Sequence, residues 1–106
     1  MAPRFTFAVL TLAAASPLGA KDGSMARARE VLRSSGCGSC HDSGVSAEHR
    51  AALAVYDLVE SEWPARMSDA QLPKLLGRLK SAPAADRKIV QEFIATELKT
   101  RALDRR

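Results

Sequence analysis

The sequence predicts an all-α fold of three to four short helices, on the basis of three observations. Apolar residues recur at spacings of three and four in several segments, as on one face of a helix. Serines stand before some of these segments and glycine or proline after them, where helices commonly begin and end. The 106 residues suffice for one domain, and the 46% hydrophobic content argues against a wholly disordered chain. No apolar run reaches the roughly 18 residues needed to cross a bilayer, so we expect no stable membrane insertion.

Residues 1–20 are predicted to be a secretory signal peptide. Arg4 gives a positive start, residues 5–15 form an apolar stretch, and residues 16–20 have the small, helix-breaking character of a cleavage region. An uncleaved anchor and a buried core helix are the alternatives, but the apolar stretch is too short to span a membrane. Cleavage after Ala20 would leave an exported domain of residues 21–106, with fifteen basic and twelve acidic side chains.

The first helix of that domain is predicted over Met25–Ser35, behind a loose lead-in at residues 21–24. Ser24 could cap this helix, and Gly36 is placed to end it. A side of the helix made of Ala28, Val31 and Leu32 would then face the core.

A second helix is predicted from Ala47 to about Ser61, with Ser46 as a possible cap. It would bury Ala52, Val55, Tyr56 and Val59, although three of these residues also suit an extended chain. The Trp63–Pro64 pair should end the helical stretch, because the residue before a proline avoids helical backbone angles.

Two further helices are predicted in the second half of the chain. Ser68 and Gln71 form a capping-box pattern, which is followed by an apolar stripe of Leu72, Leu75, Leu76 and Leu79. Pro73 should distort this helix without forbidding it. The last helix is expected over about residues 86–101, with one face made of Ile89, Val90, Phe93, Ile94 and Leu98.

The segment Cys37-Gly38-Ser39-Cys40-His41 carries the specific chemistry of this sequence. It is a C-x-x-C-H pattern, which is typical of covalent attachment of c-type haem. Two thiols three positions apart on a helical turn can each form a thioether with one vinyl group of the porphyrin. The following histidine can then bind the iron as its proximal ligand, while its other ring nitrogen donates to a backbone carbonyl. Cys37, Cys40 and His41 are therefore predicted to hold one haem c.

Other roles for the cysteine pair have less support. A thioredoxin-like redox pair calls for a preceding strand, and no strand pattern precedes Cys37. Structural zinc would need four ligands, and His49 is the one further side chain of a suitable kind. A plain Cys37–Cys40 disulfide in a haem-free interaction module remains an alternative, although it leaves His41 unexplained.

Through these residues, the chain resembles the small bacterial monohaem cytochromes c of class I type. The residue-by-residue match is limited to Cys37, Cys40 and His41, and the order of elements agrees in outline over residues 21–106. The resemblance implies helices wrapped around one covalently bound haem, with an early helix and the last helix crossing beside it. It also implies a periplasmic electron carrier rather than an enzyme, with a methionine from a later loop as the sixth iron ligand.

Met67 is the first candidate for that distal ligand, and His49 is the alternative. Met67 follows Trp63–Pro64 in a predicted non-helical stretch, but it lies closer to His41 than the family layout usually has it, and it could instead pack on Leu72. His49 is only eight residues past His41, which makes the opposite face of the ring hard to reach. Met25 lies upstream and is expected to be packing. If neither Met67 nor His49 binds, an open iron site would favour a gas or redox sensor or a small peroxidase-like protein.

The remaining expectations concern the surroundings of the haem. Trp63 is the candidate aromatic contact, because a buried indole N–H requires a hydrogen-bond partner. Arg27, Arg29 and Arg33 flank the motif and could steer an acidic redox partner to the haem edge, unless they are simply a solvated helix face. Nucleic-acid binding is not expected, because the net charge is modest and acidic residues are interspersed.

Overall fold

The computed structural model describes residues 17–105, with side chains from residue 23 onward. Within this part the chain is helical and contains no strand, which confirms the all-α prediction. The helices are α2 (Pro17–Ser34), α3 (Gly38–His41), α4 (Arg50–Val55), α5 (Lys74–Gly77) and α6 (Ala84–Asp104). The described part has five helices where three to four were predicted; the additional one is α3, which, like α5, is a single turn of four residues. No described helix is long and apolar enough to cross a membrane.

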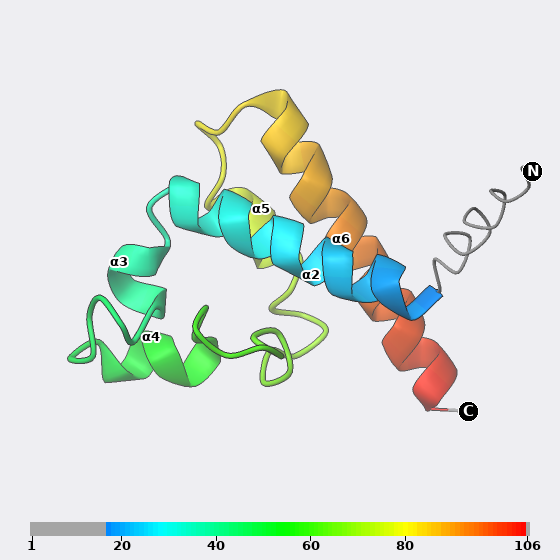
Figure 1. The fold of residues 1–106 in the computed structure, drawn as a ribbon, viewed down its shortest axis with the longest axis horizontal. Coiled ribbons are helices and arrows are strands. Elements are labelled where there is room, and N and C mark those ends of the chain that lie inside the picture. Colours follow the sequence, from blue (N-terminus) through cyan, green and yellow to red (C-terminus); the bar gives the residue numbers. More distant parts are fainter. Residues whose placement is uncertain (1–16, 106) are drawn as a thin grey trace, which may run out of the picture.

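Helices α2 and α6 cross each other and make the most extensive helix–helix contact in the described part of the chain (Figure 1). Both helices place a face in one continuous apolar core. Helix α3 and helix α4 lie together beyond the C-terminal end of α2, and α5 packs against α6. The core is made of Met25, Ala28, Val31, Leu32, Tyr56, Leu58, Trp63, Met67, Leu72, Leu75, Leu79, Val90, Phe93 and Ile94.

The predicted final helix is confirmed and is slightly longer than expected. It buries Val90, Phe93 and Ile94, while Ile89 and Leu98 pack at the edge of the core. This is the face that the spacing of apolar residues predicted.

The start of the first helix was predicted wrongly. Residues 21–24 belong to α2 and are not a loose lead-in, so Ser24 lies inside the helix rather than at its cap. Gly23 is tolerated there because a glycine costs a helix only about 1 kcal/mol, and packing against α6 outweighs that cost. The predicted signal peptide falls mostly on residues outside the described part and stays a prediction.

The second helix is much shorter than predicted. It covers only Arg50–Val55, and Tyr56 already has an extended backbone with φ −162° and ψ 152°. Tyr56 is buried as expected, but Val59 is 54% exposed, contrary to the prediction. The chain leaves the helix here because Tyr56, Asp57 and Leu58 form contacts with the segment around His41, which are described below.

The capping box and the leucine stripe are present, although the helix they introduce is a single turn. The Gln71 N–H donates to Ser68 Oγ at 3.1 Å, and the Ser68 N–H donates to Gln71 Oε1 at 2.8 Å. Pro73 is the N-cap of α5, so the α-helix begins only after the proline. Leu72, Leu75 and Leu79 are buried.

Candidate haem-attachment site

The end of α2 fixes the position of the first cysteine. Gly36 has φ +88°, a left-handed conformation that favours glycine. The Cys37 N–H donates to Leu32 O at 3.0 Å and the Gly36 N–H to Arg33 O at 3.1 Å. These two bonds form a Schellman motif, which closes the helix and turns the chain sharply. The prediction that Gly36 ends this helix is confirmed, and Cys37 begins the next turn directly.

Helix α3 gathers the residues of the C-x-x-C-H motif on one helical turn. Cys37 is its N-cap, and Cys37 O accepts hydrogen bonds from the Cys40 N–H at 3.3 Å and the His41 N–H at 3.0 Å. Both cysteines are free thiols, and both thiols and the imidazole are half-buried. The turn therefore presents two reduced thiols and one histidine side by side, which is the arrangement that thioether attachment requires.

The imidazole of His41 is oriented through one of its nitrogens. His41 Nδ1 lies 3.1 Å from Tyr56 O. A carbonyl only accepts, so this bond places a ring proton on Nδ1, and in the neutral imidazole Nε2 then carries the free lone pair. The expected backbone carbonyl is thus identified as that of Tyr56. The Leu58 N–H donates to His41 O at 2.7 Å, which ties the same two segments together again.

Tyr56 also covers the face of the imidazole. The two rings are stacked, with centroids 3.8 Å apart and an angle of 6° between their planes. Burial, reinforced by neighbouring Cys37, raises the pKa of the Tyr56 hydroxyl well above its usual range, so the phenol stays protonated. The ring holds His41 in one orientation while its hydroxyl lies beside the first cysteine.

The Cys37 thiol is not a reactive thiolate. Burial raises the pKa of this thiol, although a hydrogen bond with Tyr56 and the nearby Arg78 act in the opposite direction. Redox-active C-x-x-C pairs depend on a lowered thiol pKa, so this environment does not favour the thioredoxin-like alternative.

Two hollows meet at this histidine. One, of about 330 Å³, is lined by Gly36, Cys37, Ser39, Cys40, His41, Ala52, Tyr56 and Arg78. The other, of about 200 Å³, is lined by His41, Val55, Tyr56, Met67, Gln71, Lys74, Leu75 and Arg78. They share His41, Tyr56 and Arg78. Between them, the two hollows are lined by both cysteines, His41 and Met67.

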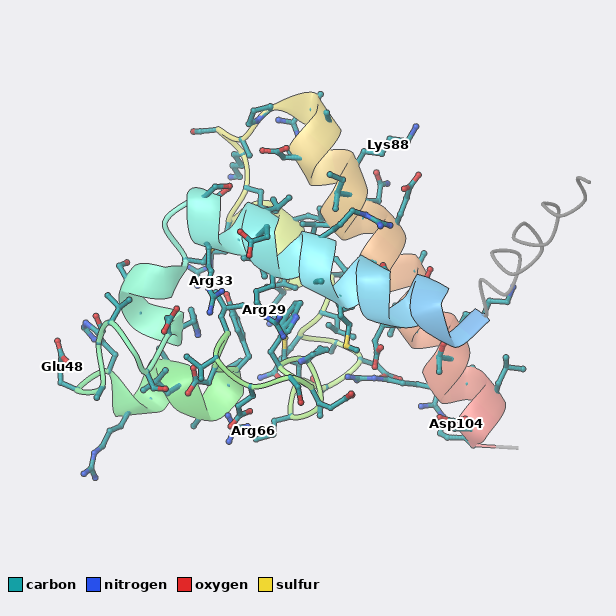
Figure 2. All side chains as sticks on the ribbon, in the orientation of Figure 1. Arg29, Arg33, Glu48, Arg66, Lys88 and Asp104 are labelled. Atoms are coloured by element: carbon teal, nitrogen blue, oxygen red, sulfur yellow. The ribbon has the colours of Figure 1, made fainter. Side chains whose placement is uncertain are left out.

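The two candidate distal ligands have different positions. Met67 is 4% exposed and lines the same hollow as His41, so the structure brings these two side chains to one place. His49 is the N-cap of α4, with its side chain 46% exposed beside Glu48, and it lines neither of these hollows. Glu48 marks this outer edge of the molecule in Figure 2. Met25 is buried in the core, as expected of a packing residue.

Trp63 was predicted as the aromatic contact for a haem, but its position does not fit that role. It is fully buried, its indole N–H donates to Met25 O at 3.2 Å, and it lines neither hollow. The indole partner is therefore a backbone carbonyl of α2. Trp63 instead lies between Tyr56 and Phe93, with ring centroids at 5.6 and 5.1 Å.

Of the three arginines considered as a basic surface, Arg29 and Arg33 bond a loop, while Arg27 is exposed; the steering role stays a prediction. Arg29 donates to Glu60 O at 3.0 Å and to Ser61 O, and Arg33 donates to Leu58 O at 3.3 Å. Both side chains extend from α2 towards this loop (Figure 2). Arg33 also pairs with Asp42 at 3.3 Å.

Lys74 and Arg78 are the basic residues that line the hollows, and sequence reasoning missed them. Within residues 23–105 neither side chain makes an ion pair. A detectable signal was present, since both lie on the polar side of the leucine stripe with no acidic residue three or four positions away.

The carboxylate of Asp57 stabilises the chain segments that follow α3 and α4. Asp57 Oδ1 accepts hydrogen bonds from the Ser43 N–H at 3.0 Å and the Val59 N–H at 3.1 Å. Burial tends to raise the pKa of this carboxyl, but these backbone hydrogen bonds outweigh it and leave the pKa below its usual range. The ionised carboxylate thus joins the segment after α3 to the segment after α4.

The described residues contain no group of three or more His, Cys, Asp and Glu side chains arranged to hold a metal ion, so the zinc alternative gains no support. A haem needs fewer protein ligands, because the porphyrin supplies four nitrogens itself. No protein-family model, curated protein or solved structure matches this chain.

Proposed function

We propose that this protein is an exported, periplasmic electron carrier with one c-type haem attached through Cys37 and Cys40. The observation that carries the proposal is the setting of His41. It follows two free thiols on one turn, its Nδ1 is directed to Tyr56 O, and it lines both hollows. This donor set fits a haem: two S–H groups to add across two vinyl groups, and one imidazole with Nε2 available for iron.

The haem would supply one-electron chemistry at iron, and the chain's own residues would control it. Cys37 and Cys40 anchor the porphyrin edge, and the carbonyl of Tyr56 makes His41 a stronger donor by accepting its Nδ1 proton. Met67 is proposed as the distal ligand, because it lines the same hollow as His41. Thioether ligation raises the reduction potential, and a ligand that fills the distal position limits access of small molecules.

The basic residues at the hollows favour an acidic redox partner. Lys74 and Arg78 are exposed, line the same hollow and have no ion-pair partner among the described residues. Unpaired positive charge beside a redox centre attracts a negatively charged protein surface and speeds encounter with it.

One observation favours a second function that keeps the haem but leaves the iron open. Met67 is a member of the apolar core and packs there without any need for iron. If it stays in that role, the distal position is free, and the protein would be a gas or redox sensor or a small peroxidase-like protein.

Carbon monoxide binding to the reduced protein separates the two functions. A carrier with Met67 on the iron should bind carbon monoxide slowly, because the thioether must first leave. Fast, saturating binding at low gas concentration would instead favour the open-site sensor. The measurement is the absorption spectrum of the reduced full chain after mixing with carbon monoxide.

A further inference from the structure

Arg101, on the last helix, contacts the loop that carries Met67. Its Nη1 donates to Met67 O at 2.7 Å and its Nη2 donates to Pro64 O at 2.9 Å. These two carbonyls belong to the first and last residues of a tight turn, which is closed by the Met67 N–H donating to Pro64 O at 3.0 Å. One planar guanidinium therefore holds both ends of the turn that ends at Met67.

The guanidinium is itself held by two carboxylates. Arg101 Nε donates to Glu97 Oε2 at 2.9 Å, one helical turn earlier, and Nη1 also donates to Asp69 Oδ1 at 3.0 Å. The Arg101 side chain is 18% exposed and that of Glu97 11% exposed. Burial acts to lower the pKa of Arg101, but the bonds with Glu97 and Asp69 raise it overall, so the charge is stable. A half-buried guanidinium with four hydrogen-bond acceptors, two of them charged, is held in one orientation.

We infer that Arg101 is a positioning residue that fixes Met67 in the hollow lined by His41; this rests on the proposed haem function. The turn at residues 64–67 lies outside any helix. Arg66, inside the turn, donates to Leu53 O at 3.0 Å, but Arg101 is the described side chain that holds the carbonyls at the two ends of the turn, including that of Met67. Without Arg101 the Met67 end of the turn loses its side-chain anchor to α6, and the Met67 side chain is then less firmly placed. Arg101 would thus control how easily the distal ligand leaves the iron.

Arg105 offers a matched control on the same helix. It lies one turn later, and its side chain pairs with Asp69 Oδ2 at 3.3 Å while making no bond to the Met67 turn. Arg105→Gln removes one positive charge and shortens the side chain, as Arg101→Gln does. It leaves the hydrogen bonds from Arg101 to Pro64 O and Met67 O in place. Arg101→Lys keeps the charge with a single-point donor in place of the planar fork, so it should fall between the wild type and Arg101→Gln.

The test measures the rate of carbon monoxide binding and the reduction potential in the haem-loaded full chain. We expect Arg101→Gln to bind carbon monoxide at least about tenfold faster than wild type, with a lower potential, and Arg105→Gln to match wild type. A tenfold change corresponds to about 1.4 kcal/mol, which is within reach of a single hydrogen bond to a charged group. If Arg101 only stabilised the fold, Arg101→Gln would lower the midpoint of unfolding. The rate of carbon monoxide binding and the reduction potential of the folded variant would then equal those of wild type.

The outcomes separate the inference from the function on which it rests. Absence of covalent haem overturns both, and fast carbon monoxide binding to the wild type overturns Met67 ligation and with it the role of Arg101. If the wild type binds slowly and Arg101→Gln binds at the rate of Arg105→Gln, the function stands and the positioning role is wrong. If Arg101→Gln does not fold, Arg101→Lys decides: a rate equal to that of the wild type overturns the inference.

Discussion

On one side of the two hollows, residues 36–41 take their conformation mainly from their own sequence, whereas on the other side Met67 depends on residues far along the chain. Gly36 forms a local helix end, and the bonds to Cys37 O close the following turn. The Met67 turn is instead held by Arg101, which is 34 positions later. If the proposed haem is bound, the residues that attach it are positioned by local sequence, while distal ligation by Met67 would depend on the tertiary packing of α6.

Replacing Met67 by leucine should have the largest effect, because it removes the thioether while nearly conserving volume. We expect the weak thioether-to-iron absorption band of the oxidised protein to disappear. The potential should fall by on the order of 0.1 V, a fraction of the roughly 0.8 V range that axial ligands cover. Stability should change by less than about 1.5 kcal/mol. Met25→Leu is the control, since Met25 is equally buried but does not line the hollow with His41. Equal spectra of Met67→Leu and wild type would refute the distal assignment.

Gly36→Ala should produce a smaller effect, confined to the locally encoded side. The position has φ +88° and open space around it, so an added methyl group strains the backbone without a clash. We expect a loss of about 1–2 kcal/mol in the free energy of unfolding, measured by chemical denaturation. Gly77→Ala is the control, because Gly77 also has open space but no positive φ, and it should be neutral or slightly stabilising. Equal effects at the two glycines would show that the turn before Cys37 does not depend on Gly36.

Asp57→Asn should have the smallest effect, a loss of stability that depends on pH. Because the folded-state pKa of Asp57 is lowered, its contribution to stability is present above the unfolded pKa of about 3.9. That contribution is lost as the pH falls through the lower folded-state pKa. The variant should therefore be less stable than wild type near neutral pH and approach it in acid, because the Asn oxygen still accepts hydrogen bonds. Unfolding curves at several pH values test this, with the exposed carboxylate variant Asp104→Asn as control; parallel curves for Asp57→Asn and wild type would contradict it.

Much of the fold could be predicted, because its signals are local. The spacing of apolar residues defined the last helix and its buried face, and the Ser68–Gln71 pair has the expected reciprocal bonds. The second helix was overestimated because its apolar residues fit a longer helix. The actual end is set by Tyr56 O and Asp57, whose hydrogen-bond partners are the His41 imidazole and the Ser43 N–H. A single sequence window contains no information about such long-range bonds.

In the candidate site, too, the residues with local signals could be predicted and those with long-range contacts could not. Cys37, Cys40 and His41 form one turn, so their spacing alone indicates the chemistry. The roles of Tyr56 and Arg101 could not be predicted, since the first resembles a core residue and the second an ordinary pair with Glu97 on a helix surface. Trp63 was assigned to the haem because its indole needed a partner, but the partner is the carbonyl of Met25.

The mass of the chain, isolated after expression with haem-attachment machinery and then denatured, tests the central proposal most directly. We predict the mass of the polypeptide plus one haem, retained after denaturation, with loss of the added mass when Cys37 and Cys40 are both replaced by serine. A denatured chain at the bare polypeptide mass, or two hydrogens lighter through a Cys37–Cys40 disulfide, would contradict covalent haem attachment and favour a haem-free interaction module.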